Sequence, residues 1–375
     1  MSSSAIALYE KMNTKPVINA LGPRTLLGGS QPHPDVISVM GEAGRYYADM
    51  DELLIGSGKV ISEMIDCSSA LVTSGCAAAL VLGTAACVTG RDAEKMSQLP
   101  NMDGLKQEVV IQASQRYKYD RVVRMVGVKI ITAGKPGSTS RKDLEDALND
   151  NTAAVLFPDI DSLGDILSLE DVISIAHDRD IPVIVDSAYR VFPTEMFQKF
   201  SNLGADLFGF GAKYFGAPNS TGLLCGRDDL VEAARLHSFS GFEKMDLEGF
   251  GRPFKVDRQE VFGVVEALRI WLDTDHDHRF ESAQIRANRL ASKLSKIGGI
   301  SVENTATGLR LILNEISDTF NGDALSEILK SGSPSIWTDS SHNSIHFDML
   351  LVNDGDEMLI ADKVKIGLDE LKKAN

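Results

Sequence analysis

A single lysine, Lys213, lies in a glycine-rich and almost uncharged stretch, DLFGFGAKYFGAPNSTGLLCG (residues 206–226), directly after a short apolar run. Glycine and apolar neighbours leave the charged form of a lysine amine poorly solvated, so we expect the pKa of Lys213 to fall. A neutral amine can then form an imine with a carbonyl group. A lysine in a glycine loop is a weak signal by itself, and its value depends on the residues that accompany it.

A second candidate is Asp186, which ends the apolar run PVIVD (182–186). The run predicts a buried β-strand, and an aspartate at the carboxyl end of a parallel strand can pair with a protonated pyridine nitrogen. Strand ends collect polar groups in many α/β proteins, so this residue also has an ordinary structural explanation.

A third candidate is the turn formed by Ser74, Gly75 and Cys76, between ALVT (70–73) and a helix rich in Ala and Leu. Backbone N–H groups and a hydroxyl at a helix start favour an anion such as a phosphate. A transmembrane span is excluded because small polar residues and glycines interrupt the apolar run and the flanking charges have no basic bias. An ordinary buried helix remains an alternative if this motif is taken alone.

Taken in chain order, the three features are a Ser/Gly turn before a helix, an aspartate at a strand end and a lysine in a later glycine loop. Together they predict a site for pyridoxal 5'-phosphate. The sequence lacks the motifs of other common enzyme classes. No dinucleotide-binding G-x-G-x-x-G follows an early strand, and neither the P-loop motif GxxxxGK[ST] nor the hydrolase motif G-x-S-x-G occurs. His276 and His278, in DTDHDHRF, indicate a charged helix junction rather than a metal site, and we expect no metal.

Composition restricts the partners. The chain has 375 residues, 43% of them hydrophobic, and a formal net charge of −15. The acidic balance counts against nucleic acid as an obligatory partner. The four cysteines lack CxxC spacing and are expected to be buried thiols, and the N-terminus resembles no secretory signal, so we expect a cytoplasmic protein without membrane association.

The elements that must position these residues form an α/β pattern from about residue 60 to 240, with strands near 70–73, 108–112, 128–132, 153–157, 182–186, 206–210 and 222–225. Continuous apolar runs such as AAVLF and PVIVD indicate strands buried on both faces of a mostly parallel sheet. A helix over about 257–296 then leads to strands near 301–305, 308–313 and 345–351 and a closing helix at 357–373. These later elements predict a smaller α+β domain.

With these residues in hand, the chain resembles the selenocysteine synthase-like branch of the fold type I pyridoxal phosphate enzymes. This branch contains bacterial selenium transferases and the D-glucosaminate-6-phosphate ammonia-lyase group. The resemblance covers most of the chain and is most specific at KYFGAPNSTG (213–222) and GRPFKV (251–256), which are similar to the family's K-x-x-x-G-P-Q-S-T-G and G-R-P-M-K-V elements.

The resemblance implies a role for each matching residue. Lys213 would carry the cofactor as a Schiff base and move the Cα proton, and Asp186 would hold the pyridine nitrogen. The remaining cofactor contacts would come from Ser74, Gly75, Cys76, Gln115 and Ala188, with Gln115 over the ring face, and the substrate anions would be held by Arg252, Lys255 and Arg116. Two departures stand out: Gln115 cannot titrate as the histidine of many relatives does, and Gly211 lacks a hydroxyl that many fold type I enzymes place near this point.

The resemblance also implies a fold and a reaction. We expect a seven-stranded large domain over 46–255, an N-terminal segment (1–45) packed on the small domain, and a connecting helix with the small domain over 256–375. The favoured reaction is β-elimination by an ammonia-lyase, which converts a hydroxylated amino acid or amino-sugar acid to a 2-keto-3-deoxy acid. We expect a homo-oligomer, and Glu52, Asp51 and Tyr117 are alternative acids for the departing hydroxyl.

Two alternatives stay open. A selenium transferase acting on seryl-tRNA would use related chemistry, but the acidic charge opposes it, and a family-like core that starts near Lys15 is expected to leave no room for a separate tRNA-binding domain. A non-catalytic binding protein would keep the fold, but a degenerate copy can lose Lys213 and Asp186 without unfolding, and this chain retains both.

Overall fold

The computed structural model describes residues 3–161, 164–245 and 247–374, which form two compact units. The larger unit is Ser30–Leu272, and the smaller unit combines the chain up to Gly29 with the chain from Asp273 onward. Each unit has its own hydrophobic core, so each can be described by itself.

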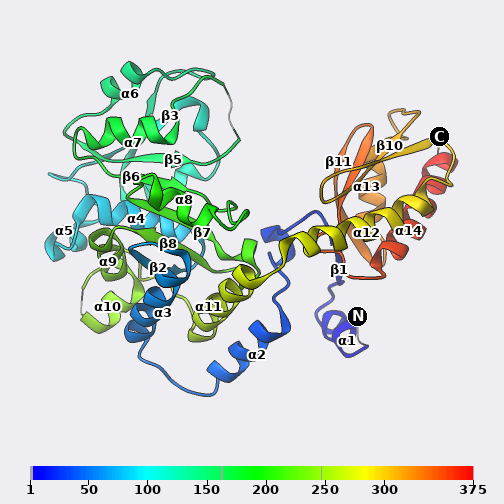
Figure 1. Cartoon of the computed structure of the whole chain (residues 1–375), viewed down its shortest axis with the longest axis horizontal. Helices are drawn as coiled ribbons and strands as arrows, with labels where there is room; N and C mark the ends of the chain where they lie inside the picture. The colour runs from blue at the N-terminus through cyan, green and yellow to red at the C-terminus, as the bar shows by residue number, and fades with distance from the viewer. Residues whose placement is uncertain (1–2, 162–163, 246, 375) are drawn as a thin grey trace. The chain divides into compact units, whose positions relative to one another are not determined.

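The larger unit is built on a seven-stranded sheet with the order β2-β8-β7-β6-β5-β3-β4 (Figure 1). All of its strands run in the same direction except β8, which is antiparallel to both β2 and β7. The strands are β2 (Ser69–Thr73), β3 (Glu108–Gln112), β4 (Lys129–Ala133), β5 (Thr152–Pro158), β6 (Val183–Asp186), β7 (Leu207–Gly211) and β8 (Gly222–Gly226). The prediction of a mostly parallel seven-stranded sheet is confirmed.

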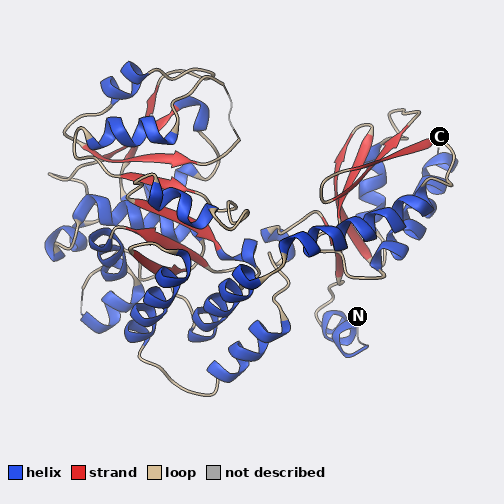
Figure 2. Ribbon diagram, viewed as in Figure 1, coloured by secondary structure: helices blue, strands red, loops and turns tan. Residues whose placement is uncertain are grey.

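Helices flank this sheet (Figure 2). They are α2 (Pro34–Ala43), α3 (Met50–Ile65), α4 (Cys76–Thr89), α5 (Ala93–Gln98), α6 (Arg141–Ala147), α7 (Leu169–His177), α8 (Met196–Asn202), α9 (Asp228–His237), α10 (Phe239–Met245) and α11 (Arg258–Asp273). Several begin at side-chain caps that accept a backbone N–H, such as Asp49 before α3 and Ser168 before α7.

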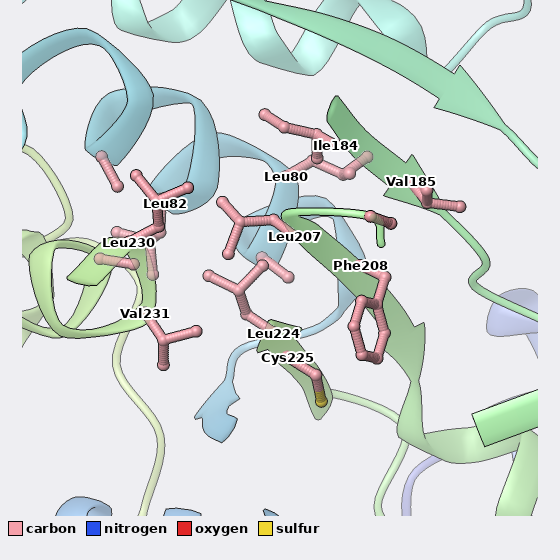
Figure 3. Packing of buried hydrophobic residues seen from close by; sticks show 14 of the residues in the cluster. Leu80, Leu82, Ile184, Val185, Leu207, Phe208, Leu224, Cys225, Leu230 and Val231 are labelled. Carbon is pink, nitrogen blue, oxygen red and sulfur yellow. The ribbon is translucent and has the colours of Figure 1, made fainter. Parts of the chain in front are cut away.

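The core of this unit explains the continuous apolar runs in the sequence. Strands β5, β6, β7 and β8 are buried along their whole length because helices cover the sheet. Helix α4 is apolar on almost all sides and packs beneath the central strands. Figure 3 shows Leu80 and Leu82 of α4 beside Leu207 of β7 and Leu224 of β8.

Strand register brings the candidate residues to one edge of the sheet. Asp186 pairs with Gly209 in the parallel β6–β7 ladder, and the last residue of β2, Thr73, pairs with Gly222 at the start of antiparallel β8. Gly222 also pairs with Gly211, the last residue of β7. The carboxyl ends of β2, β6 and β7 therefore lie together, as expected of a ligand-binding edge in an α/β sheet.

The smaller unit has a five-stranded sheet in the order β1-β11-β12-β10-β9, in which β1 runs parallel to β11 and the other pairs are antiparallel. Its strands are β1 (Val17–Ala20), β9 (Ile300–Asn304), β10 (Gly308–Leu313), β11 (Ser335–Ser341) and β12 (Ser344–Asp348), and its helices are α1 (Ser3–Lys11), α12 (His276–Leu294), α13 (Gly322–Ser331) and α14 (Asp356–Ala374). Leu290, Leu311, Phe347 and Ile360 are buried in its core.

The structure differs from the sequence-based expectation in the connection between the units. The single helix expected over 257–296 is two helices, α11 and α12, because Asp275 caps α12 by accepting the His278 N–H at 2.9 Å. The compact units divide after residues 29 and 272. Val36 of α2 and Val264 of α11 are buried in the core of the larger unit, which places both helices there.

Two kinds of feature are absent from the described residues. None of their helices has the length and apolar character needed to cross a bilayer. Within the same part of the chain, no three His, Cys, Asp or Glu side chains are grouped as metal ligands.

Candidate active site

Asp186, the last residue of β6, is a buried carboxylate with three donors around it. The Tyr117 hydroxyl donates to Oδ2, the Ala188 N–H donates to Oδ1 at 3.1 Å, and the Cys76 thiol lies 3.5 Å from Oδ1. Burial raises the pKa of Asp186, and the three donors oppose that shift. The arrangement favours a cationic partner that can offset the cost of burying the charge.

The helix α4 begins beside this carboxylate. Gly75 is its N-cap residue, with a positive φ of 92° that favours glycine, and the first turn of the helix has no acidic residue. The backbone N–H groups of this turn carry the positive end of the helix dipole and suit an anion. The Cys76 side chain points to Asp186. Cys76 can therefore contact an anion at the helix start only through its backbone N–H.

Strand β8 passes very close to the start of α4. A Cβ atom placed on Gly222 would lie 2.5 Å from the carbonyl carbon of Gly75 and 2.6 Å from the Cys76 nitrogen. Only a residue without a side chain fits there, so Gly222 determines how tightly the Gly75 turn is held against the sheet edge.

Lys213 belongs to a short 3₁₀ helix, η4 (Ala212–Phe215), that follows β7 directly. The Gly211 N–H donates to the Ala188 carbonyl oxygen at 2.8 Å and thereby ties the lysine segment to the segment after Asp186. The Lys213 amine lies 5.0 Å from the centre of the Tyr214 ring. Three residues predicted as cofactor contacts thus lie at the ends of two neighbouring strands: Asp186 and Ala188 at the end of β6, and Lys213 just after β7.

Gln115 lies at the end of a 3₁₀ turn, η2 (Ala113–Gln115), that follows β3. Its side chain is buried, donates from Nε2 to the Pro158 carbonyl at 2.9 Å, and accepts from Gln112 Nε2 at 3.1 Å. Its amide is therefore oriented by β3 and β5. Its predicted place over the cofactor ring stays a proposal.

Tyr117 is the residue whose place at Asp186 the sequence did not reveal. Its backbone N–H donates to Asp120 at 3.2 Å, which positions the side chain so that its hydroxyl reaches Asp186. Burial, and then the charge of Asp186, raise the pKa of Tyr117 well above its usual range, so the phenol stays protonated. A tyrosine that follows Gln115 by two residues was the available signal, but the contact spans 69 positions of the chain.

The structure separates the three alternative acids. Asp51 is buried and pairs with Arg235, and the Ser240 hydroxyl donates to it at 3.0 Å. Glu52 follows it on α3 and is exposed. Of the three, Tyr117 is the one whose hydrogen bond reaches Asp186.

The predicted substrate-binding cations have different surroundings. Arg116 contacts Asp120 through its Nε and donates from Nη1 to the Thr132 hydroxyl at 3.2 Å. Arg252 pairs with Glu243 of α10 at 2.5 Å, and its guanidinium lies 6.0 Å from the centre of the Phe242 ring. Lys255 is exposed. Arg116 directly precedes Tyr117, whose hydroxyl donates to Asp186. Arg252 is held by its ion pair with α10.

Comparisons with known proteins place these features in context. Residues 113–335 match the sequence profile of the family described as aminotransferase class-V. A 5'-C-glycyluridine monooxygenase-decarboxylase from Streptomyces sp. is 28% identical over 347 residues, covering 88% of this chain and 83% of the relative. D-glucosaminate-6-phosphate ammonia lyase from Salmonella typhimurium is 27% identical, with coverage of 78% and 76%.

More distant relatives include an L-seryl-tRNA(Sec) selenium transferase from Aquifex aeolicus, 22% identical, with coverage of 78% of this chain and 68% of the relative. Among solved structures, a D-glucosaminate-6-phosphate ammonia-lyase superimposes with a TM-score of 0.87 at 24% identity, covering 97% of this chain and 99% of that structure. A serine palmitoyltransferase from S. paucimobilis with bound PLP has a TM-score of 0.55 at 13% identity, with 98% of both chains covered. These similarities confirm the resemblance expected from the sequence and the fold type I architecture.

Proposed function

We propose that this chain, which belongs to the aminotransferase class-V family, is an ammonia-lyase for a hydroxylated amino acid or amino-sugar acid. The chain is a pyridoxal phosphate-dependent enzyme of fold type I. In the proposed reaction the substrate loses the Cα proton and the β-hydroxyl as water, and hydrolysis of the resulting enamine releases ammonia and a 2-keto-3-deoxy acid. The observation that supports this choice best is the similarity to D-glucosaminate-6-phosphate ammonia-lyase in both sequence and fold.

The described residues fit pyridoxal phosphate. Asp186 offers a buried carboxylate for the pyridine nitrogen, and the turn at Ser74, Gly75 and Cys76 offers a helix start for the phosphate. Lys213 follows the neighbouring strand and offers the amine for the aldehyde. When bound, the cofactor supplies an electron sink for the negative charge that develops at the substrate Cα.

Two side chains would handle protons in the proposed reaction. The Lys213 amine would take the proton from Cα once substrate has displaced it from the cofactor. The Tyr117 hydroxyl, kept protonated by its raised pKa, would donate a proton to the departing β-hydroxyl. Asp186 would keep the hydrogen bond from the Ala188 N–H throughout and keep the pyridine nitrogen protonated.

The alternatives have weaker support. The selenium transferase relatives act on a seryl-tRNA, and a net charge of −15 opposes a large nucleic-acid interface. A non-catalytic binding protein would have no need for a lysine and an aspartate at neighbouring strand ends, and both are present. The Streptomyces relative indicates that oxygen uptake and carbon dioxide release need to be measured beside ammonia release.

The test is a screen of the purified holoenzyme with hydroxylated amino acids and amino-sugar acids. We expect equal amounts of ammonia and 2-keto acid from at least one substrate, without oxygen uptake, and no product from Lys213→Ala. Carbon dioxide release with oxygen consumption would show that the enzyme is an oxidative decarboxylase and not a lyase. Full activity in Lys213→Ala would refute the assignment of the lysine.

A further inference from the structure

A basic concavity adjoins the contact between Tyr117 and Asp186. Its volume is about 720 Å³, it opens to solvent, and one continuous segment from Arg116 to Met125 lines it. The segment contains η3 (Asp120–Val126) and supplies four cations to the concavity: Arg116, Lys118, Arg121 and Arg124. Tyr117 forms part of the same wall.

Most of this positive charge is not neutralised by the protein. Arg116 pairs with the buried Asp120, while Lys118 lies 4.8 Å from the centre of the Tyr119 ring. Arg121 and Arg124 are exposed. Within 3–161, 164–245 and 247–374, no carboxylate lies at ion-pair distance from Lys118, Arg121 or Arg124. In a chain of net charge −15, such a cluster concentrates positive potential at one place and attracts an anion.

We propose that this concavity binds the phosphate group of a phosphorylated amino-sugar acid. The inference rests on the proposed function, because the phosphate would belong to the substrate of that reaction. Guanidinium groups present paired donors that match phosphate oxygens, so Arg121 and Arg124 are its principal ligands. Tyr117 connects the concavity to the proposed cofactor site, since it lines the concavity and its hydroxyl reaches Asp186.

The size of the cluster favours a single phosphate over a nucleic acid. A seven-residue 3₁₀ segment spans about 14 Å, which brings its cations around one small ligand. Proteins that bind nucleic acids distribute their cations along many phosphates. A chain with this much negative charge would repel such a backbone beyond the concavity.

The test compares two non-reacting ligands on the holoenzyme by calorimetric titration. The ligands are 6-phosphogluconate and gluconate, which share a carboxylate and hydroxyl groups but differ in the phosphate. We expect 6-phosphogluconate to bind about tenfold or more tightly than gluconate, because charge-assisted hydrogen bonds to phosphate are strong. In the double variant Arg121→Gln/Arg124→Gln this preference should fall to about one, without a change in Tm, because both side chains are exposed.

The matched control is Lys372→Gln/Lys373→Gln, which removes the same charge from the last turn of α14 in the smaller unit. It should keep the full preference for phosphate. Neither ligand has an amino group to react, so the preference is measured whether or not the enzyme releases ammonia. If no substrate releases ammonia but the wild type still prefers 6-phosphogluconate, the proposed lyase reaction is refuted and the phosphate site is not. Three results would overturn the phosphate site. The wild type could bind the two ligands equally, or the arginine variant could keep the full preference for 6-phosphogluconate. The wild type could also bind an RNA stem-loop more tightly than 6-phosphogluconate, with that binding lost in the arginine variant.

Discussion

Among single residues, the site depends most on the buried carboxyl group of Asp186 and on the donors that surround it. Burial raises its pKa, and the hydrogen bond from Tyr117 is the largest of the effects that oppose this shift. Tyr117 thus acts on Asp186 as well as on the proposed leaving group. Its hydroxyl is therefore the group whose removal tests both roles with the least change in packing.

Tyr117→Phe keeps the ring and removes the hydroxyl that contacts Asp186. We expect the pKa of Asp186 to rise further and kcat for the proposed reaction to fall about 10²-fold or more, as on loss of a general acid. KM should change much less, because the substitution keeps the aromatic ring and leaves the other residues that line the concavity unchanged. Steady-state kinetics with the substrate found in the screen measure both.

Tyr119→Phe is the matched control for this experiment, because Tyr119 is exposed and packs edge-on against Tyr117 at 5.9 Å. It should leave kcat near the wild-type value. An unchanged kcat in Tyr117→Phe would show that Tyr117 is not the acid in the proposed mechanism. Another residue would then have to protonate the leaving hydroxyl.

At the scale of elements, the anion-binding turn depends on the close approach of β8 to the start of α4. Gly222→Ala would place a methyl group 2.5 Å from the Gly75 carbonyl carbon, so the turn must move. We expect the variant to lose about 1–3 kcal/mol of stability and to bind pyridoxal phosphate more weakly. Thermal unfolding and titration of the apoprotein with cofactor measure the two effects.

The control is Gly56→Ala on α3, where no heavy atom lies within 4 Å of the added Cβ. Because alanine favours a helix interior over glycine, this variant should be as stable as the wild type or slightly more stable. A Gly222→Ala protein with normal stability and cofactor affinity would show that the turn tolerates displacement.

Helices α4 and α9 are joined by a hydrogen bond of 2.7 Å between the Thr89 hydroxyl and His237 Nε2. Burial lowers the pKa of His237 from 6.5 to about 4. The unfolded chain therefore binds more protons than the folded chain between these values, and stability is lost as the pH falls through this window. We expect this histidine to contribute a loss of about 3 kcal/mol between pH 6.5 and 4.

Chemical denaturation across this pH range measures that dependence. His237→Gln, which removes the titrating group, should show a correspondingly smaller loss over the same range. His278→Gln removes an exposed histidine from α12 and should behave as the wild type does. Identical pH profiles for the wild type and His237→Gln would contradict the role assigned to the buried imidazole.

The elements also show which parts of the fold are readable from sequence. Asp186 ends a strand as predicted, because a buried apolar run bounded by a polar residue is a local signal. The strand β1 was not predicted, since it acquires its partner β11 more than 300 residues later in the chain. The break between α11 and α12 depends on the Asp275 cap, and helical periodicity continues on both sides of it.

At the scale of the whole molecule, the acidic chain concentrates positive charge along the segment from Arg116 to Arg124, next to Asp186. The sequence predicted Asp186 at the carboxyl end of a parallel strand, which is where ligands bind in α/β sheets. The concavity and the contact of Tyr117 with Asp186 were not predictable in this way. Both depend on how a loop after β3 folds back toward β6, which has no local sequence signal.

Lys213 is the residue assigned here to carry pyridoxal phosphate. The most direct measurement is the visible absorption spectrum of the purified protein before and after borohydride reduction, followed by peptide mapping of the reduced product. We predict an absorption band that reduction removes and a cofactor adduct that maps to Lys213. An adduct on another lysine, or no band after cofactor is added to the folded protein, would show that Lys213 does not carry the cofactor.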